Sequence, residues 1–168
     1  MNTQIYIIDS SAIFSGKNLI FPNADLYTTP GVQQEFSPGG KDYRRFQLLT
    51  EIGMHIQSPS SEYIHHTQKI IEQQGEQHRL SPTDIELIAL AYELHKTSQK
   101  KVQLLTDDYS IQNIAKTMNI PYLPINQKGI TKKFKWATRC PACGKTYQAS
   151  IEICQICGSK TTFSHNKK

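Results

Sequence analysis

Four cysteines near the C-terminal end are spaced as metal ligands. They form two Cys-x-x-Cys pairs separated by ten residues, each pair followed by glycine, and are Cys140, Cys143, Cys154 and Cys157. One such pair brings two thiolates close enough for a tetrahedral Zn²⁺, with Zn–S distances of about 2.3 Å, and two pairs complete its four ligands. No position is then left for a catalytic water, so we expect one structural zinc in a zinc ribbon.

Two disulfides, a redox-active Cys-x-x-Cys or an iron site are the other uses of such cysteines. The N-terminal residues lack the basic charge and the long apolar run of a secretory signal, so an intracellular, cytoplasmic location is expected, and this disfavours disulfides. A redox-active Cys-x-x-Cys normally accompanies a βαβ pattern and is not expected twice in a short basic segment. Zinc is therefore the favoured interpretation.

A second set of candidate residues is acidic and lies in the first 125 residues. Three of these acids directly follow predicted strands and two lie on predicted helices: Asp9, Asp107 and Asp108, then Glu35 and Asp84. Converging carboxylates repel one another unless a divalent cation lies among them, and hard oxygen ligands suit Mg²⁺ or Mn²⁺. One or two such ions would support in-line phosphodiester hydrolysis by activating a bound water.

Each acid also has a purely structural interpretation. Asp84 lies at the capping-box position of its helix, and Asp107 or Asp108 can cap the helix that follows them. Glu35 can be an exposed helical residue, and Asp9 can cap the first helix. The joint placement of the acids at one edge of the predicted sheet favours the metal site.

Strands and helices must bring these side chains together, and the hydrophobic pattern predicts an alternating α/β chain. Short apolar runs predict strands at 4–8, 54–57, 102–106 and 122–125. Between them the sequence predicts helices that start at Pro30 and Ser81 and that span 41–52, 62–77 and 110–118. Such alternation favours a parallel sheet covered by helices, with a site at the carboxyl ends of the strands.

The charge distribution divides the chain near residue 125. Residues 1–125 contain 10 Lys and Arg against 13 Asp and Glu, a net charge of −3, whereas residues 126–168 contain 9 against 1, a net charge of +8. The cysteines lie wholly in the basic part. We expect an N-terminal domain at 1–125, a basic linker at 126–138, the zinc ribbon at 139–163 and a tail at 164–168.

The basic part also contains aromatic residues. Basic side chains interleaved with aromatic rings suit phosphate contacts and base stacking, so nucleic acid is an expected partner. The alternative is that the aromatic rings only cover the small core of the ribbon. The candidate contacts are Lys132, Lys133, Lys135, Trp136, Arg139 and Lys145. No membrane partner is expected, because no apolar run approaches the roughly 20 residues of a membrane span.

Together these motifs resemble those of the PIN-domain nucleases. The resemblance rests on a strand followed by Asp9-Ser-Ser, the helix with Glu35, the Ser-Pro-Thr-Asp84 helix and the sequence Leu-Thr-Asp107-Asp108, and it covers nearly the whole N-terminal domain. With the four-cysteine ribbon, the chain is similar to the archaeal Nin-one-binding endonucleases of that family. The resemblance implies that Asp9, Glu35, Asp84 and one or both of Asp107 and Asp108 bind the catalytic metal.

The same resemblance implies an activity. It is cleavage at the 3′ end of the small-subunit ribosomal RNA precursor. From the acids and the basic segment we expect a metal-dependent endoribonuclease that is selective for single-stranded RNA and leaves a 3′-hydroxyl and a 5′-phosphate. Proteins of the pre-ribosomal particle are implied as partners, and an archaeal source is expected. Two alternatives are a PIN toxin-type ribonuclease, which the appended ribbon disfavours, and a non-catalytic RNA-binding ribosome assembly factor whose acids are structural.

Overall fold

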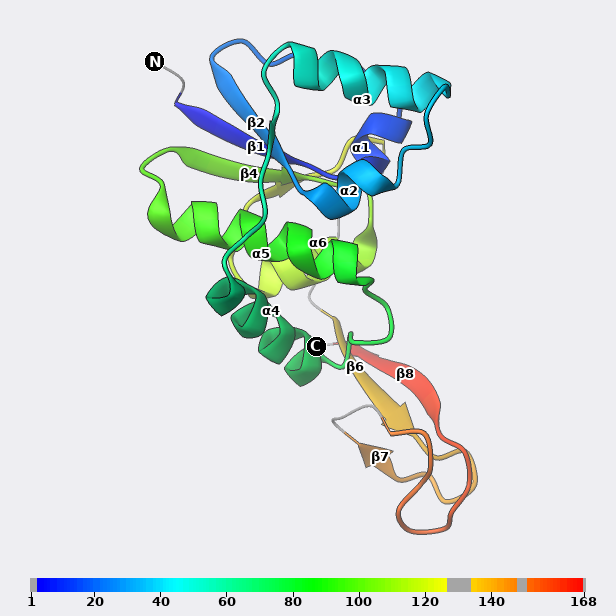
Figure 1. Cartoon of the computed structure of the whole chain (residues 1–168). Coiled ribbons are helices and arrows are strands. Elements are labelled where there is room, and N and C mark those ends of the chain that lie inside the picture. The colour runs from blue at the N-terminus through cyan, green and yellow to red at the C-terminus, as the bar shows by residue number, and fades with distance from the viewer. Residues whose placement is uncertain (1–2, 127–133, 148–150, 168) are drawn as a thin grey trace.

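The computed structural model describes residues 3–126, 134–147 and 151–167 of the chain (Figure 1). The first of these ranges contains β1 Gln4–Ile8, α1 Ser10–Phe14, β2 Ala24–Thr28, α2 Pro30–Gln34, α3 Lys41–Glu51, β3 His55–Ile56, α4 Ser61–Gln74, α5 Pro82–Thr97, β4 Lys101–Leu105, α6 Tyr109–Thr117 and β5 Tyr122–Leu123. The remaining two contain β6 Phe134–Arg139, β7 Thr146–Tyr147 and β8 Thr162–Lys167.

The larger sheet has five parallel strands in the order β3-β2-β1-β4-β5. The central strand β1 pairs with β2 on one side and with β4 on the other, so that Ile8 lies opposite Leu105. This register brings the residues that follow β1 and β4 to the same edge of the sheet. With helices flanking the sheet, the predicted α/β fold class is confirmed.

The strand β2 is the element of this sheet that the sequence analysis did not predict. Only one of its apolar side chains, Leu26, is buried, so the run lacks the hydrophobic pattern of the other strands. Its place comes from tertiary pairing with β1 and β3. The Thr28 hydroxyl also donates a buried hydrogen bond to the Ile8 carbonyl at 2.8 Å, which fixes the end of β2 beside the end of β1.

Local signals set where the helices of the site begin and end. Pro30 occupies the first turn of α2, and the Thr29 hydroxyl accepts from the Val32 N–H. The helix α4 ends at Gln74, three residues earlier than predicted, because Gly75 adopts a φ of 72° and terminates it in the left-handed conformation.

The core of the N-terminal domain lies between the sheet and the helices. Ile7 and Ile8 of β1 and Leu104 of β4 are fully buried, as are Leu87 and Leu90 of α5, which contacts both strands. Truncation of one such side chain to alanine typically costs about 2–5 kcal/mol of stability. The strands that carry Asp9 and the acids after β4 are therefore a rigid platform.

The smaller sheet is antiparallel, in the order β7-β6-β8. Its long strands extend beyond both ends of the segment 139–163 expected for the ribbon, β6 toward the linker and β8 into the tail. Residues 127–133 of the expected linker lie outside the described residues, so the domain boundaries stay a prediction. Among the described helices, none has both the length and the apolar character needed to cross a membrane.

Candidate active site and metal centre

Asp9, directly after β1, is an almost fully buried carboxylate with 4% of its surface exposed. Its backbone N–H donates to the Leu105 carbonyl at 3.1 Å, which continues the pairing of β1 with β4. Burial raises the pKa of Asp9 to about 6, and the charge of nearby Asp84 adds to the rise. Hydrogen bonds from Ser11 and Thr106 lower the pKa without cancelling this effect. A cation would stabilise the buried negative charge.

Two hydroxyl groups hold one oxygen of this carboxylate. Ser11 Oγ donates to Asp9 Oδ2 at 2.5 Å, and Thr106 Oγ1 donates to the same atom at 2.7 Å. Each hydroxyl accepts a backbone N–H at 3.0 Å, Ser11 from Asp107 and Thr106 from Asp108. Because a lone pair of each hydroxyl faces an amide, its proton is directed to the carboxylate. Neither hydroxyl contacts Oδ1 of Asp9, and a hydrogen bond from the Ser10 backbone also reaches this carboxylate.

Asp84, in the first turn of α5, is both a helix cap and a candidate ligand. Its Oδ2 accepts from the Ser81 N–H at 2.7 Å and from the Ser81 hydroxyl at 2.8 Å, which closes the capping box. The structural interpretation of this residue is correct, but it leaves the second oxygen outside the capping bonds. Since the charge of Asp84 acts on Asp9, the structure couples these two of the predicted acids electrostatically.

The two acids after β4 bind the backbone. Asp107 is nearly buried and accepts from the Ile125 N–H at 2.7 Å, from the Asn126 N–H at 2.9 Å and from the Asn126 side-chain amide at 3.0 Å. Asp108 is exposed and caps α6 by accepting from the N–H groups of Ser110 and Ile111. Asp107 thus fixes the segment after β5 and Asp108 starts α6, and which of the two faces a metal stays a prediction.

Glu35 ends α2 with an exposed side chain. The helix itself is fixed against α5, because the Gly31 N–H donates to Glu86 Oε2 at 3.1 Å, and a Cβ at Gly31 would lie only 2.6 Å from that oxygen. Within the described residues, no three carboxylate or imidazole groups lie within 4.8 Å of one another. The acids therefore do not form a closed cage here, and their joint role as ligands stays a prediction.

Ser11, Thr106 and Glu86 position the site but were not identified from the sequence. The two hydroxyl residues had a usable signal, since each lies within two residues of a candidate acid. The pairing of Ile8 with Leu105 makes Asp9 and Thr106 neighbours. Glu86 had none, because its partner is a backbone amide 55 residues away in the chain.

The four cysteine thiols converge, as their spacing predicts. Their Sγ atoms all lie within 4.8 Å of one another, with 3.4 Å between Cys140 and Cys157 and 3.6 Å between Cys143 and Cys154. Four sulfurs arranged tetrahedrally around zinc at about 2.3 Å lie about 3.8 Å apart. All four cysteines are free thiols. The donor set therefore fits Zn²⁺, in agreement with the predicted zinc ribbon.

Each cysteine pair lies in the same kind of tight turn. The Gly144 N–H donates to the Cys140 carbonyl and the Gly158 N–H to the Cys154 carbonyl, both at 2.9 Å. The two glycines have φ angles of 75° and 70°, which residues with a Cβ rarely adopt. The glycine after each pair is thus required by the turn that holds the thiols together.

Hydrogen bonds make the thiols unequal when no metal is bound. The Tyr147 hydroxyl, 3.2 Å from Cys154 Sγ, is the main group that lowers the pKa of Cys154 to about 6. A hydrogen bond from the Lys145 backbone lowers the pKa of Cys143. Desolvation and the other three thiols raise it by more, so that the pKa is about 12. Thiolate is the metal-binding form, so zinc bound at this site would displace a proton from Cys143.

The predicted RNA-contacting residues are only partly covered by the described side chains. Arg139 and Lys145, at the two ends of the first cysteine turn, are exposed. Lys132 and Lys133 lie outside the described residues, as do the side chains of the two others on β6, Lys135 and Trp136. Contact of these six residues with RNA stays a prediction.

The chain is similar in sequence to a known protein family and to several known ribonucleases. The family model for the PIN domain of ribonuclease matches residues 6–94. The chain is 35% identical to Ribonuclease VapC1 of Thermoplasma acidophilum, an alignment that covers 98% of this chain and 80% of that protein. It is 37% identical to Endoribonuclease Nob1 of Methanocaldococcus jannaschii, over 93% of this chain and 75% of the relative. It is 33% identical to Endoribonuclease Nob1 of Archaeoglobus fulgidus, over 98% of this chain and 93% of that protein.

The alignments to both kinds of relative extend through the cysteine segment of this chain. The alignment to VapC1 covers 98% of this chain and so includes the cysteines, as does the alignment to Nob1 of Archaeoglobus fulgidus. That the appended ribbon distinguishes the two alternatives stays a prediction.

Proposed function

The chain belongs to the PIN-domain family of ribonucleases, and from this premise we propose that it is an endoribonuclease that cleaves precursor RNA at the 3′ end of the small-subunit ribosomal RNA. The observation that carries the proposal is similarity over nearly the whole chain to four archaeal proteins named Endoribonuclease Nob1, at 30–37% identity and 91–98% coverage of this chain. The family makes the protein an RNA-cleaving enzyme. The precursor RNA and the position of the cut are the proposal.

Asp9 and Asp84 form the centre of the proposed catalytic site. With Glu35, Asp107 and Asp108 they would hold one or two Mg²⁺ or Mn²⁺ ions, and hard carboxylate oxygens around a buried negative charge fit such ions. A divalent cation bound there would activate water for in-line hydrolysis and stabilise charge on the phosphate, and the expected products are a 3′-hydroxyl and a 5′-phosphate.

The basic C-terminal part supplies the affinity for RNA in this proposal. The N-terminal domain has a net charge of −3 and by itself attracts a polyanion poorly, whereas the remainder has a net charge of +8. Four thiolates and one Zn²⁺ add −2, so this part stays near +6 with zinc bound. Phosphate contacts from it would position a single strand at the acidic site. Proteins of the pre-ribosomal particle are proposed as further partners.

A cleavage assay with the whole protein tests the proposed substrate. With Mn²⁺ present, a precursor fragment that spans the 3′ end of the small-subunit RNA should be cut at one position that generates the mature end. A control fragment with that junction scrambled, but of equal length and composition, should remain uncut. Equal cleavage of both fragments would contradict the proposed substrate while leaving ribonuclease activity intact.

A toxin-type ribonuclease is the second candidate, favoured by the 35% identity to the protein named VapC1. It predicts preference for an RNA other than the ribosomal precursor. A panel that contains the precursor fragment, transfer RNA and an unstructured messenger RNA separates the candidates. Preferential cleavage of transfer RNA or messenger RNA would support the toxin-type enzyme.

Removal of the two hydroxyls that hold Asp9 should weaken catalysis without abolishing it. For the double variant Ser11→Ala and Thr106→Val we expect a rate about 10–100-fold lower at limiting Mn²⁺, as is typical when groups that orient a metal ligand are lost. Part of the loss should be recovered at saturating Mn²⁺. Cleavage rates measured across Mn²⁺ concentrations test this.

The matched control for the two hydroxyls is Ser15→Ala. The Ser15 hydroxyl donates to the Ala12 carbonyl just after the same helix α1, away from Asp9. The variant Ser15→Ala should leave the Mn²⁺ dependence of the cleavage rate unchanged. If the double variant behaves like the control, Asp9 does not depend on these hydroxyls for its orientation.

A further inference from the structure

The end of the larger sheet remote from the candidate acids carries a basic cavity. It has a volume of about 410 Å³ and lies where α5 ends and where β1 and β4 begin (Figure 1). Two lysines, a histidine and two glutamines are among the residues that line it, namely Lys100, Lys101, His95, Gln4 and Gln103. We call it the amino-end cavity. The proposed catalytic site uses none of these residues.

The parallel sheet separates this cavity from the candidate acids. Because β1, β2 and β4 run in the same direction, their amino ends meet at one edge of the sheet and their carboxyl ends meet at the other, where Asp9 lies. The strand β1 has five residues and therefore spans about 17 Å. A ligand held in the amino-end cavity must extend over at least this distance before it reaches Asp9.

Positive charge is concentrated beside the amino-end cavity, although the N-terminal domain as a whole has a net charge of −3. Residues 95–101 include three lysines and one histidine and no acid. Asp25 pairs with Lys100 at 2.5 Å and compensates its charge. Lys96 and Lys101 are exposed, and neither forms an ion pair within the ranges that the structure describes. These two ammonium groups are available to a polyanion.

An aromatic cluster adjoins the amino-end cavity. Tyr92 lies three positions before His95 and four before Lys96 on α5, so that the three side chains lie on one side of the helix. The His66 ring of α4 stacks on the Tyr92 ring, with 5.1 Å between the ring centres and an angle of 4° between the planes. Lys96 Nζ lies 5.3 Å from the centre of the same ring. The His66 side chain is exposed, so a further planar group can stack on this cluster.

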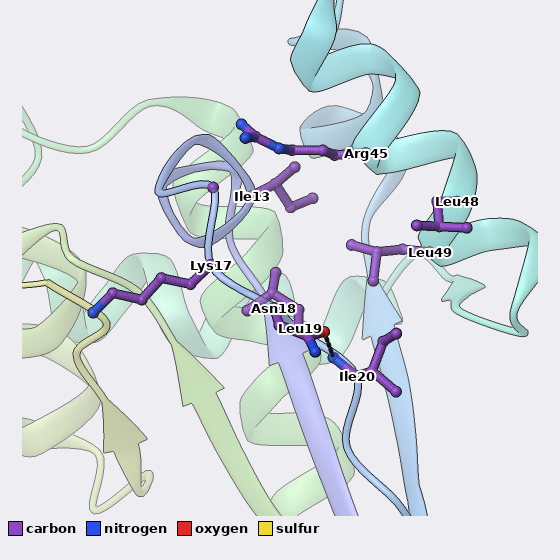
Figure 2. A pocket seen from close by; sticks show the side chains of 9 residues that line it. Ile13, Lys17, Asn18, Leu19, Ile20, Arg45, Leu48 and Leu49 are labelled. Atoms are coloured by element: carbon purple, nitrogen blue, oxygen red, sulfur yellow. Dashed lines mark hydrogen bonds between the residues drawn. The ribbon is translucent and has the colours of Figure 1, made fainter.

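The cavity beside α1 and α3 lacks this combination (Figure 2). It has a volume of about 220 Å³ and a mostly aliphatic lining, and no aromatic ring is among the described residues that line it. Both of its cations have partners. Arg45 pairs with Asp42 at 2.6 Å. Lys17 donates to the Ile125 carbonyl. Positive charge and a stacking surface therefore coincide at the amino-end cavity and not at the aliphatic one.

We propose that the amino-end cavity and the adjoining aromatic cluster form a second binding site for the RNA substrate. Phosphate groups would contact Lys96 and Lys101, and a base would stack on the His66 ring. The strand would run from this site along the N-terminal domain to the acids at the carboxyl ends of β1 and β4. The inference rests on the proposed function, because it takes the RNA substrate as the ligand.

Single-stranded RNA fits this surface better than an acidic peptide does. The carboxylates of a peptide would use the two ammonium groups but not the face of the His66 ring. RNA supplies both phosphates and planar bases, and every base has a face that can stack. The amides of Gln4 and Gln103 add hydrogen-bond donors and acceptors of the kind that base edges require.

This arrangement makes the affinity depend on the length of the RNA. Stacked nucleotides advance about 3.4 Å each, so about five of them cover the roughly 17 Å between the two edges of the sheet. An RNA of about four nucleotides centred on the cut reaches only the acids, whereas one of about 30 nucleotides can occupy both sites. The contribution of the basic C-terminal part is common to all variants of the N-terminal domain.

RNA binding by the whole zinc-loaded protein, measured in Ca²⁺ so that the RNA stays intact, tests the two lysines. For Lys96→Ala with Lys101→Ala, we expect the Kd for the long RNA to rise about tenfold. The slope of log Kd against log salt concentration should fall by about 1.4, since two phosphate contacts to a single strand are lost. The matched control, Lys41→Ala with Arg44→Ala, removes two exposed cations from α3 and should change neither quantity. Circular dichroism checks that each variant is folded.

The adjacent histidines of α4 test the stacking surface. His66→Ala should raise the Kd for the long RNA by about threefold to tenfold without changing the salt slope, because stacking releases no counterions. His66→Phe restores a ring and should restore the affinity. The control His65→Ala removes the neighbouring exposed imidazole, whose Nδ1 lies 2.8 Å from the Ser61 carbonyl oxygen, and should leave the Kd unchanged.

Cleavage kinetics decide whether the second site acts on the substrate of the reaction. In the double lysine variant, KM for the long RNA should rise about tenfold with kcat unchanged, and kcat/KM for the short RNA should stay at the wild-type value. Wild-type affinity of this variant for the long RNA, or an equal loss for short and long RNA, overturns the second site.

The same measurements separate this inference from the proposed function. Equal cleavage of precursor and scrambled RNA would contradict the ribosomal substrate, whereas a length-dependent loss of affinity in the lysine variant would still support the second site. Affinity that the lysine and His66 variants leave unchanged, together with correct cleavage of the precursor, would overturn the second site alone.

Discussion

Replacing Asp9 by asparagine should lower the rate of RNA cleavage by about 10³-fold or more while leaving RNA affinity unchanged. Loss of a carboxylate ligand removes several kcal/mol of transition-state stabilisation by the metal, which corresponds to a rate factor of this size. The expected RNA contacts lie in the basic C-terminal part, far along the chain from Asp9. Single-turnover cleavage with Mn²⁺ and a binding assay with Ca²⁺ or EDTA measure the two effects separately.

The control for Asp9→Asn is a substitution at another acid of the same domain. Asp25 is on β2, where it pairs with Lys100 at the amino end of the sheet, so Asp25→Asn should keep full activity. Cleavage by Asp9→Asn at the wild-type rate would mean that the proposed metal site is wrong. Loss of RNA binding together with cleavage would instead point to a binding role for this residue.

The same substitution should stabilise the protein when no divalent ion is present. Burial raises the pKa of Asp9 from 3.8 to about 6, so the folded protein binds a proton that the unfolded chain releases between these pH values. Stability of the wild type therefore falls as pH rises from about 4 to about 6 and stays lower above that range. At pH 7.5 the charged Asp9 lowers the free energy of unfolding by up to about 3 kcal/mol, and Asp9→Asn removes this charge.

Thermal unfolding in EDTA and in Mn²⁺ tests whether Asp9→Asn stabilises the metal-free protein. In EDTA at pH 7.5, Asp9→Asn should have the higher Tm, and the difference should shrink below pH 5. Addition of Mn²⁺ should raise the Tm of the wild type more than that of the variant, because binding to the folded state stabilises it by mass action. Identical responses to Mn²⁺ would argue against a metal ligand at this position.

The fold was largely predictable from the sequence, because strong local patterns agree with the tertiary structure. The buried apolar runs of β1 and β4 and the Ser81-Pro82 start of α5 are recognisable from their own residues. The strand β2 could not be predicted, since its residues become a strand through pairing with β1 and β3 rather than through their own pattern. Position next to other strands is a tertiary property that a local sequence pattern does not contain.

The site was predictable in its residue types more than in its geometry. The carboxyl ends of β1 and β4 meet as expected, and this places Asp9 beside Thr106. The sequence could not show that Asp107 binds the backbone after β5, because that contact depends on the path of the chain 18 residues later. For Asp84 the structural and the metal-binding interpretations are compatible, since capping occupies only Oδ2.

The cysteine pattern was the most predictable feature, because its geometry is local. Each turn is closed within five residues by a backbone hydrogen bond and a glycine with positive φ, so spacing alone specifies where each pair of thiols points. Only the approach of the two turns to each other requires the antiparallel sheet, in which Arg139 pairs with both Thr146 and Thr162.

Loss of one zinc ligand should unfold the C-terminal module and leave the N-terminal domain folded. Among its described side chains, the buried ones are Ala137, Thr138, Cys140 and Cys154, so half of them are candidate zinc ligands. Structural zinc contributes apparent binding free energies of about 10–16 kcal/mol in small peptides, and without it so small a core is insufficient. For Cys140→Ser we expect no bound zinc, loss of dispersed NMR signals from β6 and β8, and preserved signals from β1 and β4.

The control for Cys140→Ser is Gln155→Ser, an equally polar change within the second cysteine turn that spares the ligands. It should retain one zinc per chain and the full spectrum. RNA affinity should fall in Cys140→Ser, since the basic residues lose their fixed positions, while cleavage of short RNA at saturating concentration persists. If Cys140→Ser keeps an ordered β6 and β8 without zinc, packing alone holds this sheet together. Preserved RNA affinity in an unfolded module would show that its charge suffices, because counterion release depends on the number of cations rather than on their exact geometry.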